Sequence, residues 1–167
     1  GIVEVNVPDK DGKLDDVVLG YANPADYIGD GPCAGKCPGR YANRIAGGRL
    51  SVEGKDYQLE INNGPNALHG GSEGFQNQIW TLEKADGNTV VMRYAAADGE
   101  ANYPGALTVR ATYVWSDDNE LQLTLEATTS AATVVNLTNH AYWNLAGHNA
   151  GSVLSEKLTL RASNYLP

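Results

Sequence analysis

The sequence predicts an all-β protein built as an antiparallel β-sandwich, and the main evidence is a pair of alternating stretches. Apolar side chains alternate with other residues in two successive runs, first at Leu107, Val109, Ala111, Tyr113 and Trp115, then at Leu121, Leu123, Leu125 and Ala127. The turn-forming residues 116–119 separate them. This pattern is typical of a long antiparallel hairpin with one buried face. No stretch shows a convincing helical period, so the chain is expected to consist of strands and turns.

The rest of the chain is also predicted to consist of strands that are joined by turns and loops. Residues 2–7 alternate like a strand, and the turn cluster 8–13 separates them from a second strand at 14–19. Two further hairpins are predicted, 49–52 with 57–61 around a turn at 53–56, and 80–84 with 89–94 around 86–88. Residues 20–48 are rich in Gly, Pro, Asp and Asn and are expected to form a long loop of functional importance. The run 153–162 is expected to form the last strand.

The segment 134–143 combines an apolar strand pattern with unusual polar side chains. If one strand continues through Trp143, its alternation places Asn136, Thr138, His140 and Tyr142 on one face. The other face is apolar except for Asn139. A polar cleft with amides, hydroxyls, aromatic rings and a titratable imidazole suits a neutral sugar. A buried His140 satisfied by a backbone carbonyl fits the same pattern, so both interpretations stay open.

Length and composition limit the classes of function. The 167 residues are enough for one domain, 1–167, with 19% charged and 42% hydrophobic residues. A net charge of −8 argues against a nucleic-acid partner. No apolar run is long enough for a membrane span, and no secretory signal pattern opens the chain, so we expect no membrane partner and a cytoplasmic location. Cys33 and Cys37 are more often reduced thiols than a disulfide or zinc site.

Both ends of the sequence lie beside strand-like runs, and the first residue is Gly1 rather than Met. We therefore expect a fragment, a processed chain or one half of a two-chain protein. The fold would then be incomplete in this chain alone.

Asn43, Arg44, His69 and His140 are the candidate site residues, and each has an ordinary structural alternative. Arg44 could be a solvated charge or pair with a carboxylate, Asn43 could hold a turn, and His69 could be a loop residue. His148 is interpreted as loop structure. The chain carries no phosphate-binding loop, Ser nucleophile elbow or metalloprotease helix motif, and the histidines give only a weak metal signal, so no metal is expected.

Three segments taken together resemble the galactose mutarotase (aldose 1-epimerase) family. They are Gly39-Arg40-Tyr41-Ala42-Asn43-Arg44-Ile45, Asn63-Gly64-Pro65-Asn66-Ala67-Leu68-His69-Gly70-Gly71, and Asn136-Leu137-Thr138-Asn139-His140-Ala141-Tyr142-Trp143-Asn144-Leu145. Their order and spacing match the family as well, and the resemblance covers essentially the whole chain. It implies a β-supersandwich and the interconversion of the α and β anomers of free aldoses such as galactose and glucose.

The resemblance also implies roles for the candidate residues. His140 would be the general acid toward the sugar ring oxygen, and Arg44 and His69, with Asn43 beside them, would bind the sugar. Ring opening needs one proton removed from the C1 hydroxyl and one delivered to the ring oxygen, which a histidine near neutral pKa can support. No redox change occurs, so no cofactor is expected. The Cys33–Cys37 segment does not belong to the resemblance.

The family's general base, a Glu, and a sugar-binding Asp lie in the C-terminal half, and neither motif precedes Pro167. A following segment or a second chain is therefore the expected partner that supplies the base. Two other functions stay open: a hexose-6-phosphate 1-epimerase, which needs a cationic cluster such as Arg40 with Arg44, and a non-catalytic carbohydrate-binding module. A glycoside hydrolase is disfavoured because it needs two opposed carboxylates.

Overall fold

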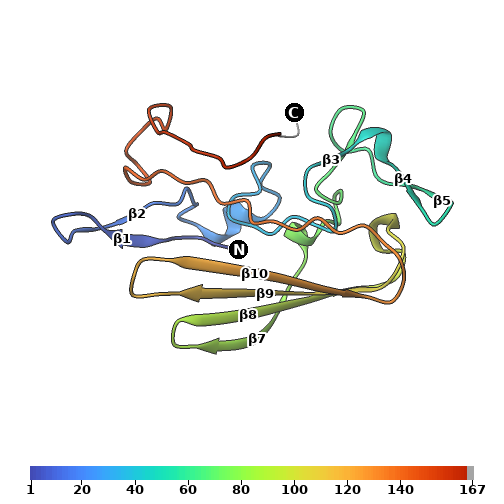
Figure 1. The fold of residues 1–167 in the computed structure, drawn as a ribbon, viewed down its shortest axis with the longest axis horizontal. Helices are drawn as coiled ribbons and strands as arrows, with labels where there is room; N and C mark the ends of the chain where they lie inside the picture. The colour runs from blue at the N-terminus through green and yellow to red at the C-terminus, as the bar shows by residue number, and fades with distance from the viewer. Residues whose placement is uncertain (165–167) are drawn as a thin grey trace.

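A four-stranded antiparallel sheet is the main element of the computed structural model, which describes residues 1–164. Its strands lie in the order β10-β9-β8-β7, with the bounds β7 Thr81–Asp86, β8 Thr89–Ala96, β9 Leu107–Trp115 and β10 Leu121–Thr129. Figure 1 shows these strands side by side as one layer, with most of the remaining chain above them in this view. The predicted all-β, antiparallel class is confirmed.

The predicted hairpin of β9 and β10 is present with its expected inner face. Leu121 pairs with Trp115 and Leu125 pairs with Ala111, so the strands run in register over their whole length. Leu107, Val109 and Ala111 of β9 are buried. Alternate side chains point to opposite faces of a strand, so these three lie on one face and pack against the layer of loops.

Among residues 1–164, three two-stranded sheets and four short 3₁₀ helices make up the rest of the regular structure. The sheets pair β1 Asn6–Pro8 with β2 Leu14–Asp16, β3 Arg44–Ile45 with β6 Ala67–Leu68, and β4 Arg49–Val52 with β5 Lys55–Gln58. The helices are η1 Pro24–Tyr27, η2 Ala46–Gly48, η3 Phe75–Asn77 and η4 Glu100–Asn102. Within residues 1–164, no helix combines the length and apolar character that a membrane crossing requires.

Several predicted strand bounds are wrong at hairpin turns. The turn between β4 and β5 consists of Glu53 and Gly54 rather than residues 53–56, because both adopt positive φ, 49° and 78°. Two successive positive φ angles match the twist of a tight hairpin, so Lys55 and Asp56 can already pair in β5. The first hairpin is also shorter than predicted, since β1 begins at Asn6 and β2 ends at Asp16.

The predicted strand through 134–143 is not a regular strand. The segment forms only isolated bridges, a parallel one between Tyr41 and Asn136 and an antiparallel one between Val18 and Trp143. Its neighbours here are loops rather than strands, so no continuous ladder can form. Across 135–143 the predicted alternation of burial fails at three positions. Val135 and Trp143 were predicted to face the core but are 41% and 43% exposed, and His140 is half-buried beside the imidazole of His69.

The 134–141 segment contacts each of the three clusters that form the core. Val134 packs on the cluster of Leu59, Ala67 and Tyr103. Leu137 packs on a cluster that includes Phe75, Leu107 and Val109, and Ala141 packs on the cluster of Val5, Val17 and Val18. Burial of these apolar side chains is the main stabilising term available to an irregular segment. The segment that carries His140 is therefore fixed by packing.

The strand predicted at 153–162 is absent. These residues form no ladder, and Leu154 and Leu158 are 93% and 82% exposed. A strand needs a neighbouring edge for its backbone hydrogen bonds, and no described strand lies against this run.

Candidate functional site

All four predicted site residues line one open depression of about 560 Å³. They come from three separate parts of the chain. Arg44 is the first residue of β3 and follows Asn43, His69 directly follows β6, and His140 lies in the irregular 134–143 segment. Ala42, Leu68, Asn136, Leu137 and Thr138 complete the lining. The fold thus brings together predicted site residues that are up to 97 positions apart, as Asn43 and His140 are.

Pairing of β3 with β6 places Asn43 directly against His69. In this register Arg44 lies opposite Leu68, and the His69 N–H donates to the Asn43 carbonyl at 3.0 Å. The Asn43 N–H in turn donates to Nδ1 of His69 at 2.9 Å. A nitrogen that accepts a hydrogen bond carries no proton, so this contact assigns the His69 proton to Nε2.

The environment of His69 favours its neutral form. Burial, together with the nearby His140 and the positive charge of Arg44, lowers the pKa of His69 below its ordinary value. At pH 7 its Nε2–H is then available as a neutral hydrogen-bond donor.

The Arg44 guanidinium lies on the exposed side of the depression between two amide oxygens. Its Nε donates to Oδ1 of Asn63 at 2.9 Å, and its Nη1 donates to Oδ1 of Asn43 at 3.2 Å. Sequence reasoning gave Asn43 a place in the site, but it gave none to Asn63. The sequence does not show that β3 pairs with β6, and this pairing is what brings the turn at residues 62–66 to Arg44.

The backbone of His140 is fixed by a loop that sequence reasoning did not connect with the site. The His140 N–H donates to the Lys36 carbonyl at 2.8 Å, and its carbonyl accepts from the Gly35 N–H at 3.0 Å. The neighbouring Asn139 amide donates to the Gly35 carbonyl at 2.8 Å. The Cys33–Cys37 segment, to which no function was assigned, therefore holds the residue expected to be the acid.

The imidazole of His140 extends into the depression without a hydrogen bond from the described residues. It meets the ring of His69 edge to face at 5.3 Å between centroids, and the ring of Tyr142 at 5.1 Å. Both nitrogens of His140 are thus available to a bound molecule.

No carboxylate lines the depression within residues 1–164. The same residues also contain no cluster of His, Cys, Asp or Glu with the arrangement of a metal site. Within this chain the site has two imidazoles, a guanidinium and amides, which can donate protons and hydrogen bonds. A strong base in the form of an Asp or Glu is not among them.

Arg40 has a different role from Arg44, although both belong to one motif. Its side chain is 2% exposed, and Nη1 donates to the carbonyls of Pro104 and Gly105, both at 2.7 Å. It also lies over the ring of Tyr103, 5.6 Å from the centroid. This buried guanidinium joins two segments of the core and does not line the depression.

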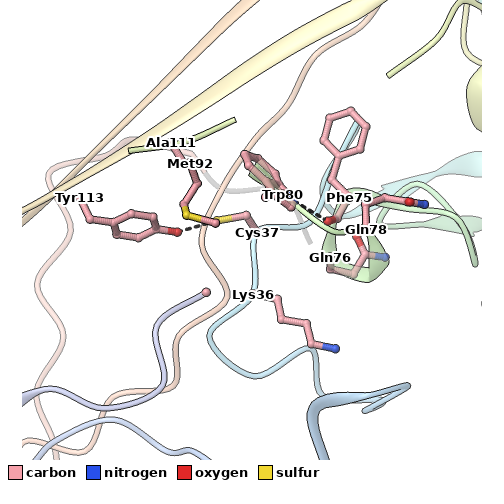
Figure 2. A pocket seen from close by; sticks show the side chains of 10 residues that line it. Lys36, Cys37, Phe75, Gln76, Gln78, Trp80, Met92, Ala111 and Tyr113 are labelled. Atoms are coloured by element: carbon pink, nitrogen blue, oxygen red, sulfur yellow. Dashed lines mark hydrogen bonds between the residues drawn. The ribbon is translucent and has the colours of Figure 1, made fainter. Parts of the chain in front are cut away.

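A second, smaller cavity of about 170 Å³ lies between the Cys37 loop and the main sheet, as Figure 2 shows. Cys37 points toward the sheet, and its Sγ lies 3.0 Å from the Tyr113 hydroxyl. Both Cys33 and Cys37 are free thiols in the structure. Burial raises the pKa of Cys33 to about 11. None of the four candidate residues lines this cavity.

Gly70 is predicted to be the least replaceable residue of the loop that carries His69. It has φ +82°, and a Cβ there would lie 2.1 Å from the Gly39 carbonyl oxygen. Gly64 is the matched control, because it has φ +56° but open space around it. We expect Gly64→Ala to cost about 1–2 kcal/mol of unfolding free energy, from the left-handed backbone alone. Gly70→Ala should cost roughly 2–5 kcal/mol, because overpacking adds to that strain. Urea unfolding of the complete protein measures both, and equal costs would contradict the predicted crowding.

The family model for aldose 1-epimerases matches residues 1–167 of this chain. The chain belongs to the aldose 1-epimerase family. The galactose mutarotase of Sus scrofa is 43% identical over 166 residues, which cover 99% of this chain and 48% of that protein. The chain thus spans about half the length of the curated relatives it matches.

Solved structures of the aldose 1-epimerase type share the fold. The GalM/aldose epimerase homologue from C. elegans has a TM-score of 0.82 and 36% identity, over 86% of this chain and 44% of that chain. Galactose 1-epimerase from Lactobacillus acidophilus NCFM has a TM-score of 0.71 and 31% identity, over 81% and 41%. The predicted galactose mutarotase-like fold is confirmed. The roles of the four site residues within it stay predictions.

Proposed function

We propose that the complete protein containing this chain interconverts the α and β anomers of free aldoses such as galactose and glucose. The observation that carries this proposal is the depression in which His140, His69, Arg44 and Asn43 meet, in a chain that belongs to the aldose 1-epimerase family. Both imidazoles and the guanidinium line this depression, which is open enough for a small polar ligand.

His140 is the proposed acid that protonates the ring oxygen. Its backbone is held by Gly35 and Lys36, while its ring nitrogens have no protein partner among residues 1–164. A positioned imidazole can give a proton to the ring oxygen in ring opening and take one back from the resulting hydroxyl in ring closure, because closure to either anomer is the reverse of its opening. His69 and Arg44 would hold the sugar and stabilise charge that develops on its oxygens.

The general base is proposed to come from the part of the protein outside this chain. The lining residues include no carboxylate within the described chain, and the relatives are about twice as long. We propose that 1–167 is the N-terminal portion of one β-supersandwich domain. The C-terminal portion would then supply a Glu opposite His140, as a following segment or a second chain. The cytoplasmic location expected from the sequence stays a prediction.

A free sugar fits the site better than a sugar phosphate. A hexose-6-phosphate epimerase was expected to use Arg40 with Arg44, but Arg40 is buried on backbone carbonyls elsewhere in the fold. Arg44 is the single lysine or arginine that lines the depression among the described residues. A phosphate carries about −1.5 to −2 charges at pH 7, and one exposed guanidinium offers it little.

Polarimetry of the complete protein tests this proposal. Freshly dissolved α-D-galactose, α-D-glucose and glucose 6-phosphate are compared at equal concentrations and corrected for spontaneous mutarotation. We expect clear acceleration with the free sugars and much less with the phosphate. Tight sugar binding without acceleration would instead favour the carbohydrate-binding module, and preference for the phosphate would favour the phosphate epimerase.

A further inference from the structure

Among the described residues, the groups that hold the Arg44 guanidinium in place are uncharged. Its two side-chain acceptors are the amide oxygens of Asn63 and Asn43, at 2.9 and 3.2 Å. None of the ion pairs formed by the described residues includes Arg44, whereas Arg93 and Arg110 both pair with Glu83. An amide fixes the direction of a guanidinium, but it does not offset the charge as a carboxylate would. The full charge of Arg44 is therefore available to the depression.

Asn63 is itself held firmly, although it does not line the depression. It lies in a turn closed by two reciprocal backbone hydrogen bonds with Asn66, at 3.1 and 3.0 Å. The preceding Asn62 uses both ends of its amide on the backbone of Leu68, at 2.7 and 3.0 Å. Leu68 lies opposite Arg44 in the β3–β6 pair. The acceptor for Arg44 and the strand that carries Arg44 thus belong to one connected unit.

We propose that Asn63 is a positioning residue that aims Arg44 into the sugar site and keeps its charge unneutralised. This inference rests on the proposed function, and it adds a residue outside the lining of the site. Asn63 supplies an acceptor of fixed direction to Nε, which leaves the Nη groups of Arg44 directed to Asn43 and the ligand. Its neutrality matters as much as its position, because a carboxylate at the same place would compete with charge that develops on the sugar.

The reach of the Arg44 charge across the site supports this proposal. Arg44 is one of the groups that lower the pKa of His69, after burial and His140. A charge that acts on the imidazole on one side of the depression also acts on an oxygen bound between them.

The test uses two substitutions of Asn63 and one matched control in the complete protein. Asn63→Asp keeps the acceptor for Arg44 and introduces a negative charge, while Asn63→Ala removes the acceptor. Asn66→Asp introduces the same charge in the same turn, at a half-buried residue whose Oδ1 accepts from the Gly47 N–H at 3.2 Å rather than from Arg44. Mutarotation of α-D-galactose by polarimetry gives kcat and KM for each variant, and thermal melting reports on folding.

Removing one charge-stabilising hydrogen-bond donor from an active site lowers kcat by on the order of 10²–10³-fold. Neutralising the charge of such a donor while it stays in place should therefore lower kcat by roughly ten-fold or more. We expect Asn63→Asp to lower kcat by roughly that factor with KM changed less than about three-fold. Asn63→Ala should raise KM as well, because Arg44 loses its direction. Asn66→Asp should stay within about two-fold of the unsubstituted protein in both constants.

Three results would overturn the proposal. The first is that both Asn63 variants retain kcat and KM within about two-fold. The second is that Asn66→Asp loses as much kcat as Asn63→Asp, since the effect would then belong to the turn and not to Arg44. The third is a loss of activity that follows the loss of melting temperature across the variants, which would indicate a structural role. If the unsubstituted protein itself shows no mutarotation, the proposed function fails first and this inference fails with it.

Discussion

Replacing His140 with Gln in the complete protein should lower kcat for mutarotation by about 10²–10⁴-fold, the usual contribution of one positioned acid or base. KM should change far less, because proton transfer to the ring oxygen occurs in the transition state and not in the bound sugar. Gln retains a hydrogen-bond donor of similar reach, so it removes the titratable group while keeping the contact. His140→Ala should lower kcat at least as much. Polarimetry with α-D-galactose at several concentrations separates the two constants.

His148 provides the matched control for this experiment. Its Nδ1 lies 2.8 Å from the Val18 carbonyl oxygen, and it does not line the depression. His148→Gln should therefore reduce stability somewhat but leave kcat close to that of the unsubstituted protein. Near-normal turnover by His140→Gln would show that the acid is another group, and His140 would then be an ordinary partly buried histidine.

Residues 1–167 alone should not accelerate mutarotation measurably above the spontaneous rate. The depression holds no carboxylate within the described residues, and an acid without its opposed base cannot complete ring opening by the proposed route. The isolated chain should also associate or precipitate, because large apolar side chains such as Trp143, Leu145 and Leu158 are 43%, 74% and 82% exposed. Polarimetry and light scattering measure these two properties.

The control is the complete protein at the same molar concentration, which should be active and better dispersed. A monomeric, well-folded chain of residues 1–167 with robust activity would contradict this prediction. A carboxylate already present in the chain would then have to be the base.

The sequence predicted those elements whose partners lie next to them in the chain. The hairpin of β9 and β10 was readable because apolar residues alternate in 107–115 and in 121–127, and a short turn joins the two runs so that Leu121 pairs with Trp115. The segment around His140 was predicted as a strand and is irregular, because its neighbours are loops distant in sequence, such as Gly35 and Lys36. The local sequence pattern of a segment does not show whether a distant neighbour will form a hydrogen-bonded ladder with it.

The candidate site followed the same rule. Asn43, Arg44, His69 and His140 could be named from motifs, and the structure places all four around one depression. The groups that orient them could not be named, because each acts through a contact that depends on the tertiary fold. Asn63 meets Arg44 only after β3 pairs with β6, and Lys36 meets the His140 backbone across more than half of the chain.

The failed strand at 153–162 has a similar cause. Leu154, Leu158 and Leu160 give the run an apolar character that suits a buried strand, yet all three are exposed. The sequence pattern predicts which residues can pair, but a strand forms only where the free edge of another strand is present to share its backbone hydrogen bonds. In the complete supersandwich we expect the C-terminal portion to provide that edge.

The depression formed by Asn43, Arg44, His69 and His140 is expected to bind the sugar with its ring oxygen at His140. A crystal structure of the complete protein with galactose bound tests it most directly. We predict that a nitrogen of His140 lies within about 2.6–3.2 Å of the ring oxygen. Arg44 and His69 should contact the sugar oxygens, and a Glu from the C-terminal portion should face the C1 hydroxyl. A galactose bound elsewhere, or bound here with its ring oxygen out of reach of His140, would contradict the claim.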